Sequence, residues 1–199
     1  MKSFVRHSEP DFLKQHAARW NRQWTALKTR NPGAQFNWYT YQGQPVNQLL
    51  APTLESQTQQ HCSYCDAFPL RKGDNTIDHF RPKGTPRFYK QAYTWKNLYT
   101  ACGHCQNVKM EKFSEDLLSP DAADYSFERY FVYNYTSHEI EINTTASPDD
   151  QHKATVTLRI FQFNHPAQVI SRRHSWERWV LKPKNERYLD DFAFRFLLM

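Results

Sequence analysis

The sequence predicts an α+β fold that is mainly helical, with a small β-hairpin and a compact core stapled by cysteines. Three observations predict it. Apolar residues recur at helical spacing near both ends of the chain, residues 130–142 alternate like two short strands, and all four cysteines fall in two C-x-x-C pairs. At 199 residues the chain is long enough for one domain, or for a small core with extensions.

Residues 1–61 are predicted to form a helical segment that packs on the core. Ser8 or Asp11 caps a first helix, which stops near residues 31–33. Residues three or four apart give this helix an aromatic face: Phe12, His16, Trp20, Trp24 and Leu27. Alternatively, Trp20 and Trp24 dock a partner protein. A second helix over residues 45–60, irregular in its first half because of Pro52, leads to the first cysteine pair.

The four cysteines predict a structural zinc site. The turns Cys62-Ser-Tyr-Cys65 and Cys102-Gly-His-Cys105 are separated by 36 residues. Two such turns supply the four thiolates of a tetrahedral zinc site. Two disulfides, a redox pair or buried thiols are the competing interpretations, and His104 is an alternative to one sulfur. A Cys₄ site is favoured because no fifth cysteine is left over.

The stretch between the cysteine pairs carries candidate catalytic residues. A turn at residues 71–75 leads into a short strand, residues 76–80, which contains Asp78 and His79. Neighbours on a strand point to opposite faces, but twist at the strand end is expected to bring both side chains to one site. Asp78 suits a hard divalent ion, and neutral His79 suits removal of a proton from water. An ordinary exposed Asp-His pair is the alternative.

A basic loop and two aromatic residues follow this strand. Arg81 and Lys83 leave the strand beside His79 and are candidate phosphate ligands. Tyr93 and Trp95 are expected to pack in the core behind the site, with base stacking as the alternative.

Taken together, these residues resemble the HNH endonucleases of the ββα-metal fold. In particular, they resemble the PtuB-like HNH nucleases of Septu-type and retron-associated anti-phage systems. The resembling motif reads Cys-x-x-Cys, Asp-His-Phe-Arg-Pro-Lys, Tyr-x-Trp-x-Asn-Leu and Cys-x-x-Cys-x-x-x-Lys. It implies a zinc-stapled ββα core over residues 62–120, whose helix, residues 104–113, carries Lys109 to a phosphate of the substrate.

The resemblance also implies a role for each motif position. His79 is the general base, Asp78 is an acidic ligand of a catalytic Mg²⁺ or Mn²⁺, and Asn97 fixes the loop and orients the base. Gln106 stands where the family usually has Asn or His as a metal ligand. Because Gln has a longer side chain, Asn107 is the alternative ligand.

Residues 121–199 are predicted to hold a hairpin and helices and are a candidate partner-binding region. Residues 130–133 and 138–142 read as the hairpin strands. Residues 153–163 fit a strand or a helix, and the resemblance favours the helix. A basic helix capped by Asn164 follows, and the apolar residues 189–199 are expected to pack on the domain or on another subunit.

Charge is unevenly distributed along the chain, which has a net charge of +6. Residues 62–112 carry nine Lys and Arg against four Asp and Glu, whereas residues 115–150 carry one against nine. Residues 172–188 are again basic, with six against two. A basic catalytic stretch suits phosphate contacts, and an ordinary solvated surface is the alternative for the basic tail.

Hydropathy and the start of the chain limit the expected location. The mean hydropathy is −0.85, and no apolar run approaches the roughly 20 residues of a membrane span. The first residues lack the apolar core of a secretory signal, and free thiols that serve a metal fit a reducing cytoplasm.

The leading hypothesis is metal-dependent hydrolysis of a nucleic-acid backbone. DNA is the expected target, and RNA, including tRNA, is the alternative. The sequence has no G-x-x-x-x-G-K-[S/T] phosphate loop. The resemblance therefore implies a separate PtuA-like ATPase subunit that regulates the nuclease in anti-phage defence. A zinc-stapled binding module without catalysis is the second hypothesis, and a thiol oxidoreductase is the third.

Overall fold

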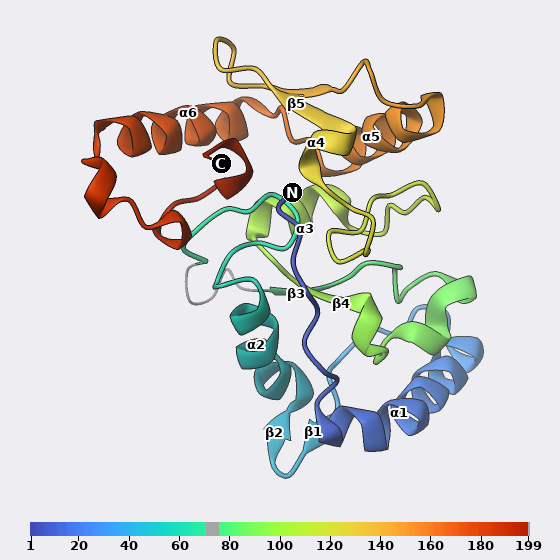
Figure 1. The fold of residues 1–199 in the computed structure, drawn as a ribbon. Coiled ribbons are helices and arrows are strands. Elements are labelled where there is room, and N and C mark those ends of the chain that lie inside the picture. The colour runs from blue at the N-terminus through green and yellow to red at the C-terminus, as the bar shows by residue number, and fades with distance from the viewer. Residues whose placement is uncertain (71–75, 199) are drawn as a thin grey trace.

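The computed structural model describes residues 1–70 and 76–198, and these form three tiers (Figure 1). Two N-terminal helices lie at the bottom, two short strands and a short helix lie in the middle, and the C-terminal helices lie at the top. From bottom to top, the main elements are α1 (Asp11–Arg30), α2 (Val46–Gln57), β3 (Thr76–His79), β4 (Leu98–Ala101), α3 (Gly103–Lys109), α5 (Pro148–Phe161) and α6 (Pro166–Leu181).

Helix α1 buries an aromatic face in the lower tier. Trp20 and Trp24 are 2% and 3% exposed, and the Trp20 ring centroid lies 5.4 Å from that of Tyr93. The packing prediction for these tryptophans is therefore confirmed over the docking alternative. Leu27 was expected on the same face but is 41% exposed near the end of the helix, and the fully buried Leu13 is the aliphatic member of the face.

A two-stranded hairpin that the sequence did not predict precedes α2. Strands β1 (Thr40–Tyr41) and β2 (Gln44–Pro45) pair antiparallel around Gly43, whose φ of +80° favours glycine. Helix α2 then runs without a break through Pro52, contrary to the irregular first half expected there. Its buried residues are spaced by four along one side: Val46, Leu50 and Leu54.

Strands β3 and β4 form an antiparallel pair that is covered on both faces. Asp78 pairs with Tyr99, and His79 pairs with Leu98. Since side chains alternate along a strand, these two pairs face opposite ways. Leu98 belongs to the lower hydrophobic core, and Tyr99 belongs to the upper one. The ββα unit therefore lies between two cores, and each face of the strand pair has different neighbours.

Two 3₁₀ helices, Pro86–Gln91 and Trp95–Asn97, occupy the connection between β3 and β4. The first packs against α1. Tyr93 and Trp95 are buried in the lower core, so their predicted packing role is confirmed over base stacking.

The upper tier contains the predicted hairpin and helices. A short helix α4 (Phe127–Tyr130), not predicted, leads into β5 (Phe131–Tyr133), which pairs antiparallel with β6 (Ile140–Ile142). The ambiguous residues 153–163 are helical, as α5, which begins at Pro148 and is capped by the Ser147 hydroxyl. Helix α6 is capped by His165 and not by Asn164 as expected.

The C-terminal segment packs back on the chain itself. It consists of short 3₁₀ turns over Lys184–Glu186, Leu189–Asp191 and Arg195–Leu197, and residues 192–198 are buried in the upper core. Packing on the domain is therefore confirmed. The buried Arg195 guanidinium donates to the Asp66 carboxylate at 2.7 Å, and both side chains are 3% exposed.

Some sequence predictions lie outside the described residues. The turn predicted at residues 71–75 and the last residue, Met199, belong to this group. In the part of the chain that the structure describes, no helix combines the length and the apolar character needed to cross a membrane.

Replacing Arg195 tests how strongly the C-terminal segment is held. Arg195→Met leaves the Asp66 carboxylate buried without its counter-charge, which costs about 3–5 kcal/mol when a buried pair is broken. Urea unfolding should show this loss. The control Arg159→Met removes an exposed arginine from α5 and should change the free energy of unfolding by no more than about 0.5 kcal/mol. Equal unfolding midpoints for the two variants would contradict the prediction.

Candidate functional site

The four cysteines meet at one point beside the strand pair. Their sulfur atoms all lie within 4.8 Å of one another, and all four thiols are free. Cys62 and Cys65 come from the turn after α2, Cys102 precedes α3, and Cys105 lies in its first turn. The main chain helps to hold this arrangement, because the Cys102 N–H donates to Cys62 Sγ at 3.3 Å.

This sulfur cluster fits a structural Zn²⁺ ion. Four thiolates around one point satisfy the tetrahedral preference of zinc, and three of the four are buried away from competing ligands. Hydrogen bonds from the Cys105, Cys62 and Cys65 thiols lower the pKa of Cys102, which favours thiolate formation within the cluster. His104 is not part of the cluster, and its ring lies 5.5 Å from that of His165. A Cys₄ set is therefore the arrangement that the structure brings together.

Asp78 points toward the zinc knuckle, into the upper core. Its Oδ2 atom accepts a hydrogen bond from the Tyr64 hydroxyl at 2.8 Å and an ion pair from Lys109 Nζ at 2.9 Å. Burial raises the pKa of the Asp78 carboxyl, and the Lys109 ammonium and the Tyr64 hydroxyl act in the opposite direction. Its Oδ1 atom has no hydrogen bond within residues 1–70 and 76–198, so one carboxylate oxygen remains open to a ligand.

His79 points the other way, into the lower tier. Its Nε2 lies 2.8 Å from the Ala92 carbonyl oxygen, and its ring stacks on Trp38 at 5.4 Å between centroids. The Phe36 ring packs against it edge to face. Burial lowers the pKa of His79 well below its usual value, and the nearby Lys83 ammonium acts in the same direction. The imidazole is therefore neutral near pH 7.

The expected convergence of Asp78 and His79 is not found. The regular pairing of β3 with β4 continues through His79, so no twist at the strand end brings the two side chains to one face. The Asp78 carboxylate contacts Tyr64 and Lys109, whereas the His79 ring contacts Ala92, Phe36 and Trp38.

Asn97 ties together the two ends of the β3–β4 connection. Its Oδ1 accepts the Arg81 N–H at 2.7 Å, and its Nδ2 donates to the carbonyl oxygens of Arg81 and Gln91, both at 3.0 Å. The Gln91 carbonyl is one residue from Ala92, which contacts His79. Asn97 therefore fixes the shape of the loop next to His79 and makes no hydrogen bond to the imidazole.

Gln106 and Asn107 lie on α3 just after the last zinc cysteine. Gln106 is half-buried and Asn107 is exposed. Within the described residues, neither side chain makes a hydrogen bond. The structure therefore leaves both amides available as oxygen ligands and does not select one of them.

The three predicted phosphate ligands have different environments. Lys109 was expected to contact a phosphate of the substrate, but its side chain is 0% exposed. Its ammonium is paired with the Asp78 carboxylate and donates to the His79 carbonyl oxygen at 2.7 Å. Its position four residues after Cys105 places it on the inner face of α3. Arg81 and Lys83 are half-exposed, and the Lys83 ammonium lies 5.1 Å from the Phe36 ring centroid.

Several residues that surround the candidate catalytic pair were not predicted from the sequence. Tyr64, between the first two cysteines, hydrogen-bonds Asp78, and Phe36 and Trp38 enclose His79. The position of Tyr64 within a zinc turn is the one available signal, since such a turn must lie against the ββα unit. Phe36 and Trp38 carry no such signal, because about 40 residues separate them from His79.

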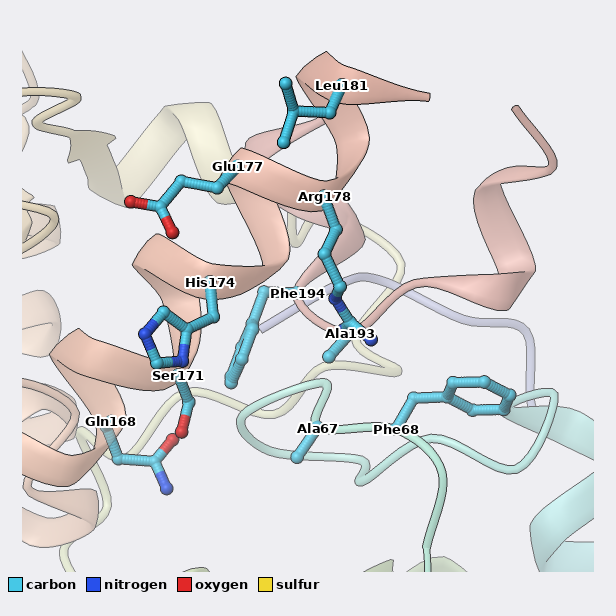
Figure 2. A pocket seen from close by; sticks show the side chains of 10 residues that line it. All are labelled: Ala67, Phe68, Gln168, Ser171, His174, Glu177, Arg178, Leu181, Ala193 and Phe194. Atoms are coloured by element: carbon cyan, nitrogen blue, oxygen red, sulfur yellow. The ribbon is translucent and has the colours of Figure 1, made fainter. Parts of the chain in front are cut away.

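A cavity of about 650 Å³ lies apart from these residues (Figure 2). The Arg178 side chain extends from α6 toward Ala193, and Ala67 and Phe68 line the opposite side (Figure 2). None of the predicted site residues lines it, so this cavity is separate from the candidate active site.

Comparison with known families agrees with this arrangement. The family model described as HNH endonuclease matches residues 62–112. The match starts at the first zinc cysteine and covers β3, β4 and α3, about a quarter of the chain. Residues 62–112 are thus an HNH endonuclease domain, which supports a nuclease acting on phosphodiester bonds of nucleic acid. No curated protein matches the chain.

Removal of one zinc ligand should unfold the centre of the molecule. Cys62→Ser is expected to abolish stoichiometric zinc and cooperative unfolding. A structural zinc contributes about 10–16 kcal/mol of apparent binding free energy, against a total domain stability of about 5–15 kcal/mol. Metal analysis and thermal melting provide the measurement. Ser63→Ala is the matched control in the same turn, because the Ser63 hydroxyl is buried without a partner. Zinc content and melting temperature equal to wild type in Cys62→Ser would refute the zinc assignment.

A double-mutant cycle measures the buried Asp78–Lys109 pair. Lys109→Met should destabilise the protein by about 3–5 kcal/mol, because the Asp78 carboxylate remains buried without a counter-charge. Combining it with Asp78→Asn should cost less than the sum of the single changes, since neither charge is then left alone. Lys112→Met, at an exposed position three residues on, is the control. Strict additivity in urea unfolding would argue against the pair.

Proposed function

We propose that this protein is an endonuclease that hydrolyses nucleic-acid phosphodiester bonds with His79 as the general base. The observation that carries the proposal is the state of the imidazole within a matched HNH domain. A carbonyl oxygen only accepts hydrogen bonds, so Nε2 must donate its proton to Ala92, and Nδ1 holds the lone pair. Nδ1 has no partner among the described residues. A neutral histidine with one nitrogen fixed and the other free is suited to take a proton from water.

The residues around Asp78 fit a divalent ion held partly by the substrate. Mg²⁺ usually binds one or two carboxylates together with water and phosphate oxygens, and Asp78 Oδ1 offers one such oxygen. Gln106 or Asn107 would add an amide oxygen from α3. When bound, Mg²⁺ or Mn²⁺ would stabilise negative charge on the phosphate and on the leaving oxygen. Lys109 holds the other carboxylate oxygen, so it orients Asp78 and does not contact substrate.

Lys83 is the basic residue best placed to bring a phosphate toward His79. Its charge influences both His79 and Asp78. A cavity of about 340 Å³ lies beside Lys83 and Phe36, on the His79 side of the strand pair. The Lys83 ammonium would attract a phosphate entering there, and the Glu111 carboxylate also lines this cavity. Phe36 and Trp38 cover the imidazole, so they must move aside for water to reach Nδ1.

DNA is the proposed substrate and RNA, including tRNA, is the alternative, because these groups act on phosphate and not on sugar. A role in anti-phage defence with a separate PtuA-like ATPase is supported by the sequence motif and by the lack of a phosphate loop in this chain. Thiols that hold zinc suit a reducing compartment such as the cytoplasm.

A zinc-stapled binding module without catalysis is the second candidate. Two observations favour it: His79 is enclosed by aromatic rings, and Asp78 is neutralised by Lys109. The third hypothesis, a thiol oxidoreductase, is disfavoured because all four sulfur atoms converge on one point, whereas a redox pair needs two sulfurs that are accessible to a partner.

Cleavage assays on labelled DNA and RNA, with and without Mg²⁺, test the proposal. His79→Ala should reduce the cleavage rate by about 10²–10⁴-fold, the usual contribution of a general base, while zinc content stays the same. His174→Ala removes an exposed histidine from α6 and should cleave like wild type.

Three results would change the conclusion. Cleavage of RNA alone would replace DNA as the substrate. Undiminished cleavage by His79→Ala would remove the proposed base. Nucleic-acid binding by a wild-type protein that cuts neither substrate would establish the binding module.

A further inference from the structure

Three neighbouring cavities near α1 and the β3–β4 connection share lining residues. The first, of about 370 Å³, lies between the N-terminal segment and β4. The second, of about 630 Å³, shares Arg6 and Lys96 with the first. The third, of about 500 Å³, shares Asn21 with the second. We call these three adjacent cavities together the α1 groove.

The α1 groove is strongly basic. Six cationic side chains line it, namely Arg6, Lys14, Arg22, Arg81, Lys90 and Lys96, against the carboxylates Glu9 and Asp121. Four of the cations are exposed and have no ion-pair partner within residues 1–70 and 76–198: Lys14, Arg22, Lys90 and Lys96. The positive charge is therefore mostly uncompensated, as it is in a surface that attracts an anion.

Arg6 gives the groove a fixed point at one end. Its side chain is 10% exposed and is held by the Asp121 carboxylate at 2.6 Å and by the Leu98 carbonyl oxygen at 2.9 Å. The guanidinium carbon lies 4.4 Å from the Tyr99 ring centroid. Its Nη2 atom has no hydrogen-bond partner among the described residues. Asp121 is occupied by Arg6, which leaves Arg81 and Lys96 free to attract an anion into this cavity.

The spacing of the cations along α1 matches an extended polyanion. Lys14 and Arg22 are two turns apart on the same side of the helix, so their Cα atoms are separated by about 12 Å along the axis. A nucleic-acid strand places a phosphate about every 3.4 Å along a duplex axis, so this distance spans about three or four phosphates. A single phosphate or a small anion would use only one end of the groove.

The groove and the candidate base share one loop. Arg81, Lys90 and Lys96 come from the β3–β4 connection, whose ends Asn97 holds together. The same connection supplies the Ala92 carbonyl oxygen that fixes His79. Figure 1 shows this green segment between β4 and the blue α1. A strand lying in the groove would therefore be held against the outer side of the loop that positions the base.

We infer that the α1 groove binds the sugar-phosphate backbone of a nucleic-acid strand next to the bond that is cut. The inference rests on the proposed nuclease function and assigns the α1 groove as the surface that holds the nucleic-acid substrate. It adds Arg6, Lys14, Arg22, Lys90 and Lys96 to the phosphate ligands expected from the motif. Contacts of this kind supply affinity and register without reading base sequence.

Binding without cleavage is the direct test. Fluorescence anisotropy with a labelled 20-nucleotide strand, single or duplexed, gives Kd in buffer without Mg²⁺ from about 50 to 200 mM salt. Lys14→Gln/Lys96→Gln should weaken binding about tenfold. It should also make the slope of log K against log salt shallower by about 1.4–1.8, because each lost phosphate contact removes 0.7–0.9. Arg159→Gln/Lys184→Gln removes the same charge from exposed positions outside the groove and should keep the wild-type slope.

Parallel measurements separate this inference from the proposed function. If the wild type cuts nucleic acid but the groove variant binds with the control's Kd and slope, the groove is an ordinary solvated surface and the inference fails while the nuclease stands. If the wild type binds a strand in the α1 groove but never cuts it with Mg²⁺ or Mn²⁺, the proposed nuclease function is wrong and the inferred binding of nucleic acid in the groove is supported. Competition by inorganic phosphate as effective as that by a strand, per phosphate, would also overturn the inference, since an extended track favours the polymer.

Discussion

Convergence of four sulfur atoms is the constraint on which the rest of the structure depends. The first cysteine pair precedes β3 and the second pair opens α3, so one sulfur cluster that could hold a zinc ion closes the ends of the ββα unit across 36 residues. Residues next to the first cysteine pair connect it to other parts of the chain. Tyr64 reaches Asp78, and Asp66 receives Arg195 from the end of the described chain. The first cysteine turn therefore contacts both the candidate site and the C-terminal segment.

The strand pair divides the chemistry of the site between its two faces. On the upper face the Asp78 charge is paired with Lys109 inside the protein, and such a pair is costly to break. On the lower face His79 lies among aromatic rings, which keep it neutral and cover it. Catalysis by this arrangement therefore requires movement of the Phe36–Trp38 cover when substrate binds, and a permanently closed cover would leave a binding module.

In the proposed nuclease, buried charges hold the fold together and exposed charges would contact the substrate. Lys109, the lysine of the motif, is buried inside the protein, so affinity for phosphate would come from cations that remain at the surface. Arg81 and Lys83 flank the candidate base, and the α1 groove continues away from Arg81 over the N-terminal helix. The helical N-terminal segment thus packs on the core and also contributes half of the cations that line the α1 groove.

The sequence by itself determined the features that depend on short-range pattern. These are the positions of α1, α2 and α6, the β5–β6 hairpin, the grouping of the cysteines into two C-x-x-C turns and the HNH motif. Only the tertiary structure decided which way Asp78 and His79 face, that Lys109 is buried, and that Arg6 and Arg81 line one cavity. The physical reason is that burial and ion pairing depend on which distant segments pack together. Phe36, Arg6 and Asp121 reach the ββα unit from outside the motif, and no local spacing encodes that contact.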